Sequence, residues 1–316
     1  MRTSLQLILT AGAAVLLGAS CTPVRADVLY VTTLEMGLPK IKKFTGPDVG
    51  SVFASSGLNQ PSGLAFDSAG NLYVANYGNS TIERYTPGGV GSVFASSGLS
   101  NPGGLAFDSA GNLYAANWST NTIQKFTPNG IGSVFVTFTS GISGPRGLAF
   151  DSAGNLYISS YFNNSIVKVT PGGVGSLFAD STSGLDAPQG LAFDSGGNLY
   201  VANAGNNTIE KFNPGGGHSI FATIGVDHPV GLAFDSTGAL YVTNSNVGFG
   251  TIEKYTQNGG ESVFVRAGLD RPGYLAFTDN FGVPLPLANQ RAIPEPSTWA
   301  LLGLGLPALL GLRRRR

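Results

Sequence analysis

The chain has 316 residues, of which 46 are glycine, one is cysteine and only 11% are charged. The glycine and proline density excludes a helical protein, and a single cysteine excludes a disulfide-stapled domain. Setting aside Arg2, Arg25, Glu295 and residues 313–316 leaves 12 basic and 17 acidic residues, a net charge of −5. Such a domain lacks the basic face that nucleic-acid binding requires.

Residues 1–26 are typical of an export signal. Arg2 precedes an apolar run from Leu5 to Gly18, and Ala26 ends a small-residue cleavage pattern. We therefore expect the mature chain to begin at residue 27. Cys21 lies inside this segment, but no large apolar residue stands three positions before it, as a lipoprotein signal requires. Lipidation of Cys21 remains the less favoured alternative.

One stretch, GLAFDSAGNLYVAN from Gly63 to Asn76, recurs along most of the chain at spacings of 41 or 43 residues. A period near 42 is typical of propeller blades or helical solenoids, and two short β-prone runs joined by turn residues favour the propeller. Asp67 can cap the turn, and Gly70 can adopt its left-handed conformation. The copies begin at Gly63, Gly104, Gly147, Gly190 and Gly231, with a degraded sixth at Gly273.

Two further β-prone segments follow each copy, the first ending at Tyr85 and the second at Ala95 in the first repeat, so each unit holds four antiparallel strands. Residues 27–54 supply the second, third and fourth strands of another unit, and residues 274–277 supply its first. The sequence thus predicts an all-β six-bladed β-propeller over residues 27–281. One blade is shared between the two ends of the domain, which removes the open sheet edges.

The repeated side chains have structural interpretations. Small alanines on the innermost strands suit a crowded axis, and the Glu, Gln, Lys and Arg residues of the third strands are expected at the wet outer rim. Five equivalent aspartates cannot all form one active site, so turn capping is the better explanation. A turn-closing role is likewise favoured over a polar ring at the channel mouth for the asparagines that end second strands: Asn76, Asn117, Asn203 and Asn244.

Residues that break the repeat are better candidates for function. The loops between second and third strands open on the same face as the segments that lead into the innermost strands. Exposed aromatic rings with a few polar groups can stack on sugars or hold an extended peptide. The alternative is that the rings pack against the neighbouring blade. The predicted ligand-binding residues are Tyr77, Trp118, Tyr161, Phe162, Arg146 and Gln189, and Phe249 is a further loop aromatic.

The C-terminal end forms a second informative segment. Residues 282–292 read as a linker, and residues 293–316 contain Pro294-Glu295-Pro296, an apolar run over residues 299–312 and a cluster of four arginines: Arg313, Arg314, Arg315 and Arg316. Fourteen apolar residues are few for a membrane span of about 20, and the arginines would hold the end on the cytoplasmic side. A plain tail anchor and a terminal helix packed on the propeller are the simpler interpretations.

The order of these three parts resembles the PEP-CTERM sorting signal. This resemblance implies a Gram-negative bacterial protein that crosses the inner membrane and is retained there by a short C-terminal transmembrane helix. Processing by an exosortase-type enzyme would follow, with final placement at the cell surface or outside the cell.

The blades also resemble NHL repeats over residues 28–279. Related six-bladed families include gluconolactonase-like and paraoxonase-like hydrolases, amidating lyases and non-enzymatic binding modules, so the fold alone does not select a function. Gluconolactonase-like propellers imply an axial divalent ion held partly by Asn or Asp between the Pro and Gly of the innermost strand. The corresponding residues here are Ser62, Gly103, Arg146, Gln189, Val230 and Gly273.

None of these six is Asn or Asp, so the hard oxygen ligands of a Ca²⁺ site are missing. His218 lies in a turn and His228 has no second histidine to join it, which does not make a zinc site. Both histidines are expected at the surface or in turns. We predict no catalytic residue, metal or cofactor.

Three functions remain open. The favoured one is a non-enzymatic, monomeric exported module that binds a glycan or a protein on its loop face. The second is a lactonase-like or lyase-like enzyme, and the third is an extracellular-matrix scaffold without a specific ligand.

Overall fold

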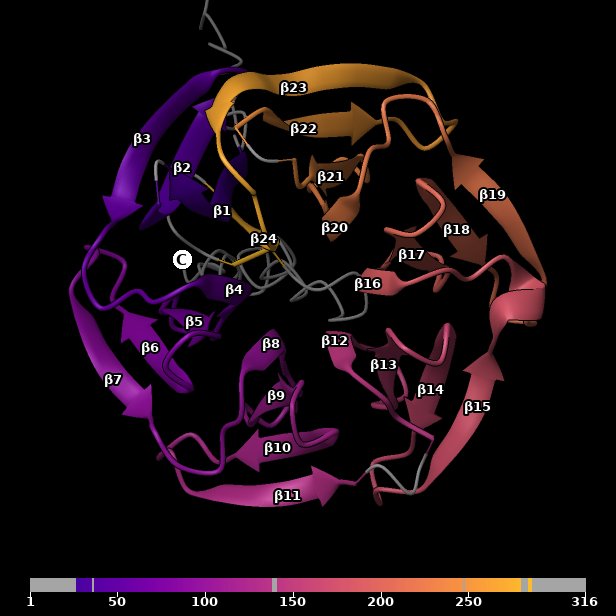
Figure 1. The fold of residues 1–316 in the computed structure, drawn as a ribbon, viewed down its shortest axis with the longest axis horizontal. Helices are drawn as coiled ribbons and strands as arrows, with labels where there is room; N and C mark the ends of the chain where they lie inside the picture. Colours follow the sequence, from indigo (N-terminus) through magenta and orange to yellow (C-terminus); the bar gives the residue numbers. More distant parts are fainter. Residues whose placement is uncertain (1–26, 36, 138–140, 247, 280–283, 286–316) are drawn as a thin grey trace, which may run out of the picture.

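The computed structural model describes residues 27–35, 37–137, 141–246, 248–279 and 284–285. These residues form six four-stranded antiparallel sheets arranged as blades around one axis, which confirms the predicted propeller (Figure 1). The predicted export signal, most of the linker and the whole sorting segment lie outside the described residues. Within the described part there is no helix long and apolar enough to cross a membrane.

Each blade runs from an innermost strand near the axis to an outermost strand at the rim. Blade I contains β4 (Pro61–Phe66), β5 (Leu72–Asn76), β6 (Thr81–Tyr85) and β7 (Gly91–Ala95). Blade II contains β8 (Pro102–Phe107), β9 (Leu113–Asn117), β10 (Thr122–Phe126) and β11 (Gly132–Val136). Blade III contains β12 (Pro145–Phe150), β13 (Leu156–Ser160), β14 (Ser165–Val169) and β15 (Gly175–Ala179).

The second half of the ring follows the same plan. Blade IV follows a short 3₁₀ turn, η2 (Ser181–Ser183), and contains β16 (Pro188–Phe193), β17 (Leu199–Asn203), β18 (Thr208–Phe212) and β19 (His218–Ala222). Blade V contains β20 (Pro229–Phe234), β21 (Leu240–Asn244), β22 (Gly250–Tyr255) and β23 (Glu261–Leu269). Blade VI contains β24 (Leu275–Asp279), β1 (Asp27–Glu35), β2 (Leu38–Gly46) and β3 (Val49–Ala54).

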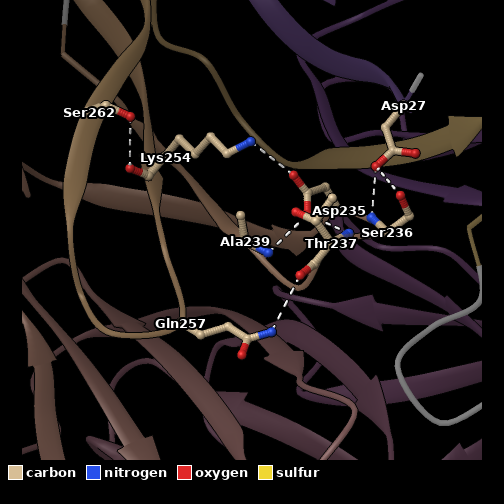
Figure 2. A network of polar contacts seen from close by, with 8 residues as sticks. All are labelled: Asp27, Asp235, Ser236, Thr237, Ala239, Lys254, Gln257 and Ser262. Carbon is tan, nitrogen blue, oxygen red and sulfur yellow. Dashed lines mark hydrogen bonds and ion pairs between the residues drawn. The ribbon is translucent and has the colours of Figure 1, made fainter. Parts of the chain in front are cut away.

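Blade VI closes the ring as the sequence predicts. β24 pairs antiparallel with β1, with Leu29 opposite Phe277. The closed blade is also tied to its neighbour: the Asp27 carboxylate accepts hydrogen bonds from the backbone N–H and hydroxyl of Ser236 in blade V, at 2.7 and 2.8 Å (Figure 2). The first residue of the domain therefore fixes blade VI against blade V.

The turn between the first two strands of a blade is built on its aspartate. In blade V, Asp235 Oδ1 accepts from the backbone N–H groups of Thr237 and Ala239, each at 2.9 Å, and Oδ2 lies 3.1 Å from Lys254 Nζ (Figure 2). Burial alone would raise the pKa of Asp235, but hydrogen bonds from the Thr237 hydroxyl, the Ala239 N–H and Lys254 outweigh it and hold the pKa below its usual value. The capping role is confirmed, and its backbone hydrogen bonds recur at Asp67, Asp108, Asp151 and Asp194.

Aromatic contacts join each blade to the next. In blade II, the second-strand Tyr114 packs edge-to-face on Phe135 of its own outermost strand and on Phe150 of the next innermost strand, with ring centroids 5.0 Å apart in both pairs. All six blades repeat this arrangement, at 4.8–5.1 Å. Since such pairs contribute about 0.5–1.5 kcal/mol beyond burial, they stabilise every blade interface.

The crowded contact near the axis is made by glycine. A Cβ atom on Gly147 would overlap the backbone carbonyl oxygen of Gln189 in the next blade, and Gly63, Gly104 and Gly190 face their neighbours in the same way. Ala106 and Ala149 instead belong to apolar clusters between blades. The closest approach near the axis is therefore made by the glycines, which the sequence analysis did not single out for this role.

The third strands also depart from expectation. Glu83, Gln124, Glu210 and Glu253 are buried rather than at the wet rim, although the lysines of these strands are partly exposed. The link from the preceding blade covers these side chains, as the close approach of Gly57 to Glu83 shows. Burial raises the pKa of all three glutamates.

We predict that Gly147→Ala destabilises the propeller by about 1–3 kcal/mol, because the added methyl group forces apart two innermost strands. Gly172→Ala is the matched control, since its Cβ would meet only Thr170 Oγ1, at 3.9 Å. Denaturant unfolding measures both variants. Equal stability of the two variants would show that the strand contact near the axis is not close.

We predict that Glu83→Gln raises the melting temperature at pH 8 and has little effect at pH 4. A carboxyl whose folded pKa is raised contributes stability below its unfolded pKa and loses it as the pH rises through the folded value. A change of about 1 kcal/mol corresponds to about 2–4 °C in a domain of this size. The reciprocal Gln124→Glu in blade II should lower stability at pH 8 only; pH-independent effects would contradict the burial argument.

Candidate binding site on the loop face

The loops that carry the candidate residues are held by a hydrogen bond that recurs in five blades. The first loop residue donates its backbone N–H to the segment that leads into the innermost strand, as Trp118 does to the Asn101 carbonyl at 3.3 Å. The equivalent donors are Tyr77, Tyr161, Ala204 and Ser245. The backbone at this position is therefore common to these blades, while its side chain is free to vary.

Side-chain hydrogen bonds join these loops across blades I, II and III. Asn101 donates to the Tyr77 carbonyl at 2.9 Å and accepts from the Ser119 hydroxyl at 2.6 Å. Asn121 then accepts from the backbone N–H of Gly144 at 2.7 Å. The loops of three successive blades thus form one connected surface.

Four rings gather on this surface. Trp118 lies 5.4 Å from Tyr161 and 4.8 Å from Phe162 between ring centroids, and Tyr161 and Phe162 are 5.3 Å apart. Phe162 is 63% exposed, and the other rings are partly exposed. Together with Tyr77 we call these rings the aromatic cluster.

Arg146 joins the rings into one group. Its guanidinium carbon lies 3.7 Å from the centroid of the Trp118 ring, 5.9 Å from Tyr77 and 5.8 Å from Tyr161. Such cation–π contacts hold the side chain without using its N–H donors. Its Nε is buried and has no hydrogen-bond partner, and within the described part of the chain Arg146 forms no ion pair.

Tyr274 also lies near Arg146, although it comes from blade VI, which stands opposite blade III in the propeller. Its hydroxyl is buried without a hydrogen-bond partner, and burial raises its pKa to about 12, while the positive charge of Arg146 acts in the opposite direction. Tyr274 replaces the glycine of the repeat, and β24 begins only after it, at Leu275, whereas the other innermost strands begin at the repeat proline.

Sequence reasoning missed both Tyr274 and Gly144. A Cβ atom on Gly144 would lie 2.7 Å from Phe162 and 3.0 Å from Trp118, so glycine leaves the space in which the two rings meet. The signal was the residue before the repeat proline, which is glycine only in blade III. Tyr274 could have been found in the sequence because the other five repeats have glycine at its position.

The structure thus brings together five of the six predicted site residues. Gln189 leads into blade IV and is partly buried. Its backbone carbonyl accepts from the Ser159 hydroxyl at 2.6 Å, and its side chain forms no hydrogen bond with any residue that the structure describes. Phe249 is 84% exposed on blade V, apart from the aromatic cluster. A role for any of these residues in binding stays a prediction.

Other polar candidates have structural roles. Asn76 is fully buried, accepts from the backbone N–H of Asn59 at 2.9 Å and donates to the Gly57 carbonyl at 2.8 Å. This confirms its role in closing a loop and rules out a polar ring at the channel mouth. His218 and His228 have side chains that are 40% and 64% exposed, as expected. In the described ranges, no three His, Cys, Asp or Glu side chains are grouped closely enough to hold a metal ion.

Comparison with known families identifies the repeats and the C-terminal end. The NHL repeat model matches residues 58–85 and 185–212, and the PEP-CTERM protein-sorting motif matches residues 292–316. The chain carries NHL repeats and ends in a PEP-CTERM sorting motif. No curated protein matches the sequence of this NHL-repeat propeller.

Solved structures show the same fold at low identity. A chain in the crystal structure of a nidogen/laminin complex is 21% identical with a TM-score of 0.69, over 79% of this propeller protein and 97% of that chain. Virginiamycin B lyase from Staphylococcus aureus is 20% identical with a TM-score of 0.56, over 69% and 77% of the two chains. A putative gluconolactonase is 16% identical with a TM-score of 0.58, over 68% and 80%.

We predict that Trp118→Ala costs less than about 1.5 kcal/mol of stability, because blade IV folds with Ala204 at the equivalent position. Tyr114→Ala, which removes a buried ring at a blade interface, should cost about 3–5 kcal/mol. Thermal and denaturant unfolding compare the two. An equally large loss for Trp118→Ala would mean that the aromatic cluster is needed for the fold.

Proposed function

We propose that this protein is a non-enzymatic recognition module that binds a glycan or a protein through the aromatic cluster and Arg146. The rings supply apolar faces for stacking and the guanidinium supplies hydrogen-bond donors. Binding surfaces built from loops on a rigid scaffold are common in proteins, and the loops of blades I–III are of this kind.

The observation that carries the proposal is the break in symmetry. Blades I, II and III place Tyr77, Trp118 and Tyr161 at one loop position, whereas blades IV and V place Ala204 and Ser245 there with the same backbone hydrogen bond. A ring needed for folding would recur in every blade, as the interface tyrosines do. Of these five blades, only blades I–III carry a ring at this loop position, and such rings are better explained by contact with a ligand.

The C-terminal motif supports an extracytoplasmic setting for this function. A PEP-CTERM signal implies export, anchoring at the C-terminus and processing by an exosortase-type enzyme. We propose that the processed propeller acts at the cell surface or outside the cell, where glycans and other exported proteins are the available ligands.

The fold itself does not choose between binding and catalysis. Among structures with this fold, one belongs to a nidogen/laminin complex and another is named a lyase. A lactonase-like or lyase-like activity remains the alternative, and stoichiometric metal in the purified protein would favour it. A matrix scaffold would show neither metal nor a specific ligand.

A glycan array probed with the purified chain tests the proposal. We expect specific oligosaccharide binding that falls by about tenfold or more in Trp118→Ala and in Phe162→Ala, as for a central interface residue. Phe249→Ala is the matched control, since it removes an exposed ring on the same face outside the aromatic cluster, and it should bind normally.

Unchanged binding by a folded Trp118→Ala would contradict the assignment of the site. Equal losses in Trp118→Ala and Phe249→Ala would also contradict it, because they would point to non-specific adhesion of exposed rings. If the unaltered chain but not Trp118→Ala captured a protein ligand, the assigned site would stand and the ligand would be a protein rather than a glycan.

A further inference from the structure

We infer that the aromatic cluster and Arg146 recognise a sugar that carries a carboxylate, that is, a uronic-acid residue of an acidic polysaccharide. The inference rests on the proposed function and names the ligand class of the same site. It depends on three features: an arginine without an anionic partner, free ring faces beside it, and backbone groups that are already paired.

Arg146 has an unused positive charge. Its guanidinium lies on the Trp118 ring, 3.7 Å from the centroid, and in the described ranges it makes no hydrogen bond or ion pair. The Nε of Arg146 is buried, but the N–H donors of the two terminal nitrogens of a guanidinium stacked in this way form a planar fork, which matches a carboxylate. The fold does not require this residue, because the corresponding lead-in residues of the other blades are Ser62, Gly103, Gln189, Val230 and Gly273.

The charge around Arg146 is not neutralised by its own half of the loop face. Two residues before the repeat proline, blades IV, V and VI carry Asp186, Asp227 and Asp270, whereas blades I, II and III carry Asn59, Ser100 and Ser143. The carboxylates of Asp227 and Asp270 are also engaged, with His228 and Asn246 in one case and with the Gly248 N–H in the other. An anion bound at Arg146 therefore meets no carboxylate at this position in blades I–III, whereas blades IV–VI carry one each.

The rings beside Arg146 favour a sugar. Phe162 is 63% exposed and tilted by 48° from Trp118, so the aromatic cluster presents an exposed apolar ring beside the tryptophan on which Arg146 stacks. The C–H face of a pyranose can pack on such a ring while its carboxylate reaches the guanidinium. A uronate combines both features in one residue.

An acidic peptide fits this site less well. Extended peptides gain much of their affinity from main-chain hydrogen bonds with the receptor. The backbone N–H groups of Trp118, Tyr161 and Phe162 are already donated to Asn101, Gly144 and Ser143. The loop therefore offers ring faces and a charge, but its N–H groups are not free to pair with a bound strand.

Calorimetric titration of the purified full chain tests the inference. The probes are oligomers of galacturonate and of mannuronate, each as the free acid and as the methyl ester, which keeps the ring and removes the charge. We expect at least one free acid to bind about tenfold or more tightly than its ester, because a charge-assisted hydrogen bond is roughly twice as strong as a neutral one. Arg146→Gln should abolish this difference.

Arg271→Gln is the matched control, since Arg271 is an exposed arginine in the lead-in of blade VI, and it should keep the preference for the acid. Equal binding of acid and ester by the unaltered chain would overturn the inference and leave glycan binding at the site intact. Equal effects of Arg146→Gln and Arg271→Gln would overturn it in favour of general charge attraction.

Absence of binding by both free acids would also overturn the inference, and Arg146-dependent binding of an acidic peptide would then reassign the ligand to protein. The comparison of acid with ester on the unaltered chain needs no substitution, so the test stands even if Arg146→Gln fails to fold. A loss of uronate binding with retained neutral-glycan binding would separate this inference from the proposed function.

Discussion

The close contact between neighbouring innermost strands determines the geometry of the whole protein. Glycine at one position in each of blades I–V lets the backbone of the innermost strand approach the carbonyl group of the next, as Gly147 approaches Gln189. The innermost strands lie around one axis (Figure 1), and hydrogen bonds join the loops of adjacent blades, as Asn101 joins Tyr77. Side chains 41 and 43 residues apart in sequence, such as Tyr77, Trp118 and Tyr161, therefore meet on one surface.

Residues that recur in the blades can be distinguished from residues that occur in only some of them. The interface tyrosines, the turn aspartates and the loop hydrogen bonds recur from blade to blade and explain how the ring holds together. The aromatic cluster, Arg146, Gly144 and Tyr274 occur in parts of the ring only and contribute nothing that the remaining blades require. In our proposal, these deviations from the repeat are where recognition has been added to a scaffold that folds without it.

The propeller could be predicted from the sequence because the same strand and turn residues recur in successive repeats. The strands, the Asp67-type turns and the shared blade all followed from a repeat of about 42 residues. The pattern failed for Glu83, since it cannot show that a link from the preceding blade covers the third strand. It identified five residues of the site but not their contact, because the meeting of Arg146 with Trp118 depends on how two adjacent blades pack.

The most direct test of the account is to follow the tryptophan indole N–H signals by NMR during titration with a uronate oligomer. The chain has two tryptophans, Trp118 and Trp299, and a Trp118→Phe variant assigns the signals. The account predicts that the Trp118 signal shifts with ligand concentration while the Trp299 signal stays in place as an internal reference. A Trp118 signal that does not move at saturating oligomer would contradict the central claim that the ring–arginine surface of blades I–III is the binding site.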